Sequence, residues 1–163
     1  MKSIILSLLA VVAISACSRP DYGKKVTVEG TKGEVFYKGD GVTEADAKKL
    51  GDYLKAANYF STEVRQSVQI VKSSDDGYDI RFAIDEKKLN AQPGASAMFE
   101  RLGAALSIDQ FNNKPVNIIL TNASFKEFKS FPFDKEMVKK LMEPGDPNEE
   151  TTHPTDSTDH TNQ

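Results

Sequence analysis

The chain has 163 residues and a formal net charge of −3, and its 39% apolar residues are enough to form the core of one domain. Cys17 lies near the N-terminus, while both histidines, His153 and His160, lie near the C-terminus. Residues 19–142 contain no His, Cys or Trp, which excludes Ser-His-Asp and Cys-His nucleophiles, thiolate metal sites and ordinary His-ligated zinc there. Because this body is near neutral and carries no glycine-rich phosphate motif, we expect no nucleic-acid partner and no cofactor.

Residues 1–16 have the pattern of a secretory signal peptide. Lys2 supplies the positive charge, and Ile4–Ile14 is an almost wholly apolar run. Eleven helical residues reach only about 16 Å, roughly half of a hydrocarbon core of about 30 Å. We therefore expect this segment to be a cleaved signal rather than a membrane span.

The end of the apolar run carries a more specific pattern. Ile14-Ser15-Ala16-Cys17 resembles the bacterial lipobox, although Ile14 stands where Leu is commoner. The resemblance implies that Cys17 receives a diacylglycerol thioether, becomes the N-terminus after cleavage and is then acylated. Lipidation would also consume a thiol that an exported protein otherwise leaves unpaired. The alternative is an ordinary secretory signal with a chance cysteine beside it.

The first elements of the body follow a short tether at 17–23. The ranges Lys25–Glu29 and Glu34–Lys38 are strand-like, and the turn residues between them predict a hairpin. Thr43 and Asp46 match a capping box, and apolar residues at helical spacing follow. The sequence therefore predicts a helix over Glu44–Asn58.

A second group of elements repeats this order. Ser67–Lys72 and Tyr78–Asp85 are joined by a loop that ends in Asp-Gly, which predicts an antiparallel hairpin. We expect a helix over about Ala95–Leu106 and a strand over Val116–Thr121.

Two similar segments of the sequence support a repeated arrangement of helices and strands. The segment Leu50–Phe60 aligns with Leu102–Phe111 through a shared L-G-x-x-L pattern. Two helix–strand units, each preceded by a strand, give the order β-α-β-β-α-β of a ferredoxin-like fold. We predict an α+β domain with a mostly antiparallel sheet, two helices on one face and an extra N-terminal strand. Chance similarity between amphipathic units is the alternative explanation of the pattern.

The C-terminal part divides into a closing segment and a tail. Phe125, Phe128 and Phe131 recur every three residues, which predicts a short 3₁₀ or irregular segment that closes the core; an exposed aromatic patch is the alternative. A short helix is expected over Asp134–Met142, so that the domain spans 24–142. Residues 143–163 are acidic and rich in Pro and Thr, which predicts a disordered tail.

The body also resembles a known type of domain. The run GEVFYKGDGVTEADAKKLGDYLKAANYF is similar to a domain of other bacterial lipoproteins and membrane proteins, to which no activity is attached. We expect a non-enzymatic interaction or accessory module with an envelope protein as partner. Since Ser18 does not resemble an inner-membrane retention signal, the outer membrane is favoured in a Gram-negative host. The acid-rich motif that sends some lipoproteins to the cell surface is not clearly present after Cys17, which favours the periplasmic face.

Two alternatives come from other classes of function. One is a hydrolase that uses carboxylates such as Asp40, Asp85 or Asp109. The other is a binder of an apolar ligand beneath the sheet, near Tyr37, Phe82 and Phe128. A cleft with two carboxylates within about 10 Å would favour the hydrolase.

Overall fold

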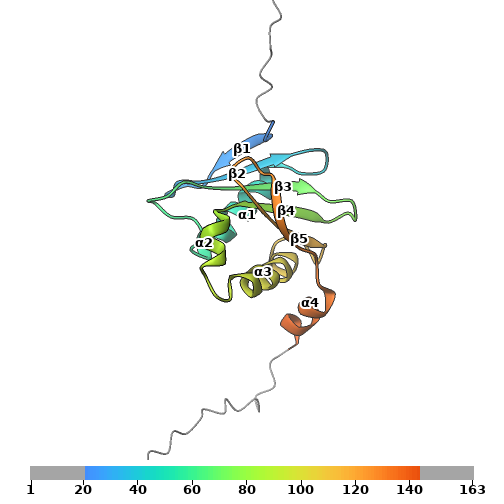
Figure 1. The fold of residues 1–163 in the computed structure, drawn as a ribbon. Helices are drawn as coiled ribbons and strands as arrows, with labels where there is room; N and C mark the ends of the chain where they lie inside the picture. Colours follow the sequence, from blue (N-terminus) through green and yellow to red (C-terminus); the bar gives the residue numbers. More distant parts are fainter. Residues whose placement is uncertain (1–20, 144–163) are drawn as a thin grey trace, which may run out of the picture.

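The computed structural model describes residues 21–143, which form an α+β fold of six strands and four helices (Figure 1). In chain order, these elements are β1 (Lys24–Thr27), β2 (Gly33–Lys38), α1 (Glu44–Ala56), β3 (Gln66–Lys72), β4 (Tyr78–Ala83), α2 (Glu86–Asn90), α3 (Ala95–Asp109), β5 (Val116–Thr121), β6 (Glu127–Phe131) and α4 (Lys135–Met142). The predicted α+β class is confirmed. The predictions for the signal at 1–16, for Cys17 and for the tail from 144 onwards lie outside the described residues.

All six strands form one mixed sheet, in which their order in space is their order along the chain. The pairs β1–β2, β3–β4 and β5–β6 are antiparallel, whereas β2–β3 and β4–β5 are parallel. The prediction of a mostly antiparallel sheet is therefore wrong. The parallel pairs arise because α1 and α3 each return the chain to its starting edge before the next strand, as in a βαβ unit.

A helix cap and several element bounds predicted from the sequence are present in the structure. The Thr43 hydroxyl accepts a hydrogen bond from the Asp46 backbone N–H, and the Asp46 carboxylate accepts one from the Thr43 backbone N–H, so that the predicted capping box starts α1. The strand at 116–121 has its predicted bounds, and α3 runs three residues further than predicted, to Asp109. The Asp134 carboxylate caps α4.

One face of the sheet forms the hydrophobic core with α1 and α3. Val35, Val68, Phe82 and Leu120 lie in one row across four strands and are fully buried. A β-carbon on Gly51 of α1 would lie 3.0 Å from a methyl of Val28, and one on Gly103 of α3 would lie 3.0 Å from the Val116 carbonyl oxygen. These glycines therefore let both helices approach the same face of the sheet, below which Figure 1 shows α2 and α3.

The two crossover connections differ in hand. Strands β2 and β3 run in one direction and β4 and β5 in the other, and both crossovers step the same way along the sheet. With both helices on one face, these two paths cannot have the same hand. One crossover is therefore left-handed, against the strong preference of βαβ units for the right-handed path.

The ferredoxin-like arrangement is not confirmed. The elements from β2 to β5 do follow the predicted order along the chain, with the short α2 added. In a split βαβ unit, however, another strand lies between the two strands that the helix connects. Here each helix connects strands that are direct neighbours, so the units are not split.

The region of the three phenylalanines is also corrected. Residues 127–131 form the edge strand β6 instead of an irregular or 3₁₀ segment. Phe131 is buried in the core against Phe99 on α3, and Phe128 packs on the edge of the core. Phe125 is buried on the opposite face of the sheet, where it contacts Phe36. The sequence also did not predict α2, which has only five residues.

Candidate functional site

An open groove of about 880 Å³ lies on the helical side of the sheet, between the end of α1, α2 and α3. Its walls are mostly apolar and come from the loop after α1 and from all three helices. Two of these side chains are large, apolar and exposed: Val64, before β3, is 62% exposed, and Met98, on α3, is 54% exposed. We call this site the apolar groove; its other apolar lining residues include Leu54, Tyr59, Ile84, Leu89, Phe99 and Leu102.

The wall of the groove is fixed to the core by aromatic packing. The ring of Tyr59 meets Phe60 and Phe82 edge to face, each with centroids 5.1 Å apart. Burial raises the pKa of the Tyr59 hydroxyl well above its ordinary value, so the residue stays neutral. Phe82 in turn contacts Phe99, whose centroid is 5.5 Å away. The groove thus has a firm inner wall below its exposed side chains.

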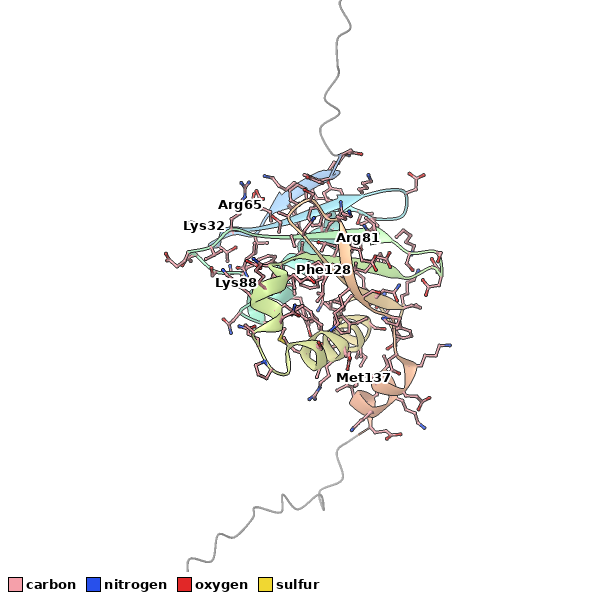
Figure 2. All side chains as sticks on the ribbon, viewed as in Figure 1. Lys32, Arg65, Arg81, Lys88, Phe128 and Met137 are labelled. Atoms are coloured by element: carbon pink, nitrogen blue, oxygen red, sulfur yellow. The ribbon has the colours of Figure 1, made fainter. Side chains whose placement is uncertain are left out.

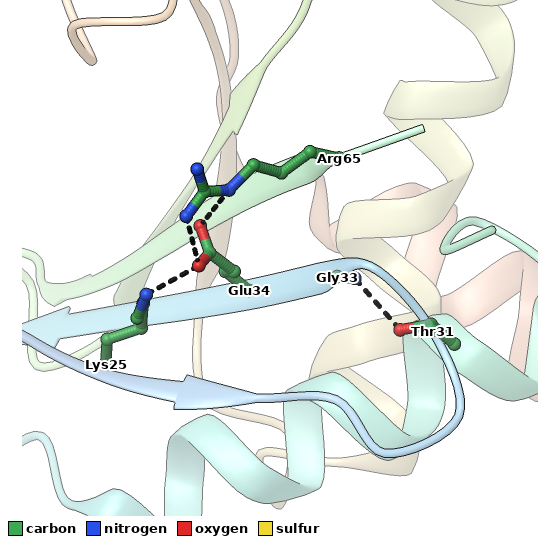
Figure 3. Close-up of polar contacts among 5 residues, drawn as sticks. All are labelled: Lys25, Thr31, Gly33, Glu34 and Arg65. Atoms are coloured by element: carbon green, nitrogen blue, oxygen red, sulfur yellow. Dashed lines mark hydrogen bonds and ion pairs between the residues drawn. The ribbon is translucent and has the colours of Figure 1, made fainter. Parts of the chain in front are cut away.

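Polar residues hold the mouth of the groove in place. The Gln66 side chain donates a hydrogen bond to the Tyr59 carbonyl oxygen and accepts one from the Ser61 backbone N–H. Figure 3 shows Arg65, which donates two hydrogen bonds to the Glu34 carboxylate. Lys88 on α2 also lines the groove, and Figure 2 shows it at the same end of the molecule as Arg65.

The three residues predicted to lie near an apolar ligand, Tyr37, Phe82 and Phe128, do not line one common site in the structure. Phe82 is fully buried behind Tyr59 and does not line the groove. Tyr37 lies next to Glu44, 3.5 Å from its carboxylate. Phe128, labelled in Figure 2, does not line the groove but a smaller hollow next to it, which Asp85 also lines. A groove beneath the sheet is present, but other residues form it.

The three carboxylates considered for a hydrolase also lie apart. Asp85 caps α2 by accepting a hydrogen bond from the Lys87 backbone N–H. Asp109, at the end of α3, lies beside Tyr53 and, after burial, contributes to raising the pKa of that hydroxyl. Asp40 lies in the turn between β2 and α1 and lines a cavity on the opposite face of the sheet. No two of these three residues line the same hollow.

The described part of the chain offers neither a metal-binding cluster nor a membrane-crossing helix. Within residues 21–143, no three His, Cys, Asp or Glu side chains are grouped so that they could hold a metal ion. None of the four helices in this range has the length and apolar composition of a membrane-crossing helix.

Most of the groove could not have been found from the sequence. Val64 lies in a loop, and its exposure follows from tertiary structure rather than from any sequence pattern. Met98 lies within the predicted helix, but helical spacing alone does not reveal that its side chain is exposed. The one available signal was Tyr59, because an aromatic residue just after a helix is often a packing anchor.

Comparison with known proteins yields a family and no further relatives. The family model AF_1994_N, described as a family N-terminal domain, matches residues 25–131, which is more than half of the chain. The match extends from β1 to the end of β6. No curated protein and no solved structure matches the chain significantly.

Proposed function

Because the chain belongs to the AF_1994_N family, whose description states no activity, we propose a function from its sequence and its groove. We propose that it is a lipid-anchored protein of the bacterial cell envelope, whose domain is a non-enzymatic binding module for an envelope protein. The partner places an apolar segment in the apolar groove. The observation that carries this proposal is the exposure of Val64 and Met98 at the groove.

The free energy of exposing apolar side chains to water explains why Val64 and Met98 support binding. Burying a large apolar side chain is worth about 1.5–3 kcal/mol, so two of them left exposed at one groove are available to stabilise a complex. Grooves with apolar walls and a few polar groups at the mouth are the usual form of binding sites. Arg65 and Lys88 supply such groups and would orient the partner.

The proposed anchor rests on the sequence alone. The apolar run at 4–14, the lipobox at 14–17 and the lone thiol support a lipidated Cys17. One acyl chain binds a membrane only marginally, whereas the two or three chains of a mature lipoprotein hold it firmly. Ser18 in place of Asp after the cysteine supports the outer membrane in a Gram-negative host, and the lack of a clear acid-rich motif after Cys17 supports its periplasmic face.

A second candidate is favoured by the same groove. Its volume of about 880 Å³ lies within the range of about 300–1,000 Å³ that is typical of small-molecule sites. An apolar small molecule, in place of a protein segment, would then cover Met98 and Val64.

A photo-crosslinking experiment separates these candidates. Met98 is replaced by benzoylphenylalanine in the full chain, and irradiation is carried out in native membranes. We expect an adduct larger by the mass of a protein, which Val64→Glu in the same chain reduces. The control places the crosslinker at Lys48, on an exposed part of α1 that does not line the groove.

The other outcomes are also decisive. An adduct larger by only a few hundred daltons would support the apolar small molecule. Equal labelling at positions 98 and 48, or labelling at neither, would contradict binding at the groove.

The anchor is tested separately by Cys17→Ser. With labelled palmitate, we expect the natural chain to take up label and to fractionate with membranes, and the variant to do neither. A labelled, membrane-bound Cys17→Ser chain would contradict the anchor.

A further inference from the structure

The face of the sheet opposite the helices is crossed by two segments that are distant in the chain. Tyr22, just before β1, and Phe125, in the loop between β5 and β6, meet over Phe36 of β2. The three ring centroids are 5.4 to 5.9 Å apart. The Gln69 side chain of β3 donates a 2.9 Å hydrogen bond to the Tyr22 carbonyl oxygen. These contacts place a cover over the middle of this face.

A cavity of about 590 Å³, wide open to solvent, lies beside this cover. Tyr22, Phe125 and Gln69 form part of its wall, and Arg81 of the central strand β4 also lines it. We call it the Arg81 cavity. It shares no lining residue with the apolar groove, which lies on the other face of the sheet.

The guanidinium of Arg81 is poorly satisfied in this position. Its side chain is 30% exposed, and its nearest carboxylate, that of Asp79, is 4.0 Å away. The Asn117 side chain holds the other oxygen of that carboxylate, Oδ1, by a 2.9 Å hydrogen bond, and Oδ2 faces Arg81. The Nε–H of Arg81 is buried and has no hydrogen-bond partner, and among the described residues no other buried side-chain nitrogen or oxygen is in this state.

A buried arginine N–H without a hydrogen-bond partner lowers the stability of the fold, and a bound hydrogen-bond acceptor would remove this cost. Arginine stays charged at any ordinary pH, so it cannot relieve the cost by losing a proton. A buried donor without a partner costs about 1–3 kcal/mol, and more when it belongs to a charged group. An oxyanion that accepts hydrogen bonds from the planar fork of the guanidinium removes this cost.

The other positively charged residues of the cavity wall already have partners, so Arg81 is the residue that can bind an oxyanion. The Lys38 ammonium donates to the Asp21 carbonyl oxygen at 3.0 Å, and Lys72 is bound to Asp76. Both lysines have carboxylate partners, Asp21 at 3.5 Å from Lys38 and Asp76 at 3.0 Å from Lys72, whereas no carboxylate of the described residues is hydrogen-bonded to Arg81. The single guanidinium charge of Arg81 suits a group with one negative charge.

We propose that the Arg81 cavity binds a singly charged phosphate group, with Arg81 as its main ligand. The group can come from a lipid headgroup or from a free phosphate compound. Its lipid source rests on the proposed anchor: Cys17 precedes Tyr22 by five residues, which span at most about 18 Å. An anchored domain therefore keeps this face near the headgroups.

NMR spectroscopy of the full chain carrying Cys17→Ser tests the proposal without the anchor. Inorganic phosphate is titrated at pH 6, where its singly charged form dominates, and the Arg81 Nε–H signal is followed. We expect a saturable shift of this signal and at least about tenfold weaker binding in Arg81→Gln, as for the loss of a bidentate, charge-assisted contact. Arg101→Gln, an exposed position on α3, is the matched control and should leave binding unchanged.

Vesicles identify the source of the phosphate. Binding to phosphatidylglycerol vesicles through Arg81, with no response to inorganic phosphate, assigns the site to a lipid headgroup; the reverse assigns it to a free compound. Binding that is equal in Arg81→Gln and the Cys17→Ser parent, or no response to either probe, would overturn the proposal. None of these outcomes depends on the apolar groove or on lipidation of Cys17.

Discussion

Arg65 donates two hydrogen bonds to the Glu34 carboxylate, at 2.9 Å from Nε and 2.7 Å from Nη2. The Glu34 side chain is only 7% exposed, and Lys25 binds the same carboxylate from the neighbouring strand (Figure 3). These contacts, the Arg65 hydrogen bonds first, lower the pKa of Glu34 below its ordinary value of 4.5, although burial opposes them. Arg65 thereby ties the start of β3, at the mouth of the apolar groove, to β2.

The first prediction concerns the pH dependence of stability. Because the pKa of Glu34 is lower in the folded state, its contribution is complete above about pH 4.5 and is lost as the pH falls through the folded-state value. Arg65→Met raises that pKa towards the ordinary value, so it lowers stability near pH 7 and flattens the loss in acid. Thermal unfolding between pH 3 and 7 measures both effects. Lys48→Met, which removes a partner of an exposed glutamate, is the control and should leave the curve almost unchanged.

The second prediction compares the two leucines of the L-G-x-x-L segments. Leu50 is fully buried, whereas Leu102 is only partly buried and lines the apolar groove. Leu50→Ala should therefore cost about 2–5 kcal/mol of unfolding free energy. Leu102→Ala should cost about 1 kcal/mol. Urea denaturation gives both values, and equal losses would show that Leu102 is as enclosed as Leu50.

A third prediction tests the start of α1. Thr43→Ala removes the hydroxyl that accepts from the Asp46 N–H, at a cost of about 1 kcal/mol. Thr43→Ser keeps this acceptor and should retain most of the stability. Chemical denaturation of both variants decides the matter, since a serine variant as unstable as the alanine variant would exclude the cap as the cause.

The fourth prediction concerns the loop that carries Phe125. The Asn122 side chain accepts hydrogen bonds from the backbone N–H groups of Ser124 and Lys126, and so organises this loop. Asn122→Ala should cost about 1–2 kcal/mol, the net worth of two such bonds. Hydrogen exchange should become faster at residues 124–126. Unchanged exchange there would show that the aromatic contacts of Phe125 alone hold the loop.

Strong local signals allowed much of the fold to be predicted from the sequence. Thr43 and Asp46 marked the start of α1, and alternating residues from Tyr78 onwards marked β4. The hairpin before β6 was missed because its left-handed position, usually a glycine, is occupied by Phe125 with φ of 55°. Contacts with Tyr22 and Phe36 compensate this strain, and no local pattern reveals them.

The neighbours of each strand and the candidate sites could not be predicted in the same way. A helix between two strands predicts a crossover, but it does not say whether a third strand lies between them, which is the feature that separates this sheet from a ferredoxin-like one. The apolar groove and the Arg81 cavity each combine residues from several elements. In the sequence, Arg81 is an ordinary polar position of an alternating strand. Its lack of hydrogen-bond partners arises only in the folded chain, so no sequence pattern could reveal it.

The opposite hands of the two crossovers bear on the origin of the domain. A gene segment that is copied in tandem yields a second unit with the path of the first, and the two copies superpose by a rotation. The units β2–α1–β3 and β4–α3–β5 follow opposite paths, so no rotation superposes their backbone traces. The shared L-G-x-x-L pattern is then convergence: a glycine lets each helix approach the sheet, and the second leucine, Leu54 in α1 and Leu106 in α3, is buried in the core. The similarity of the two segments thus reflects how their helices pack on the sheet and not a duplication.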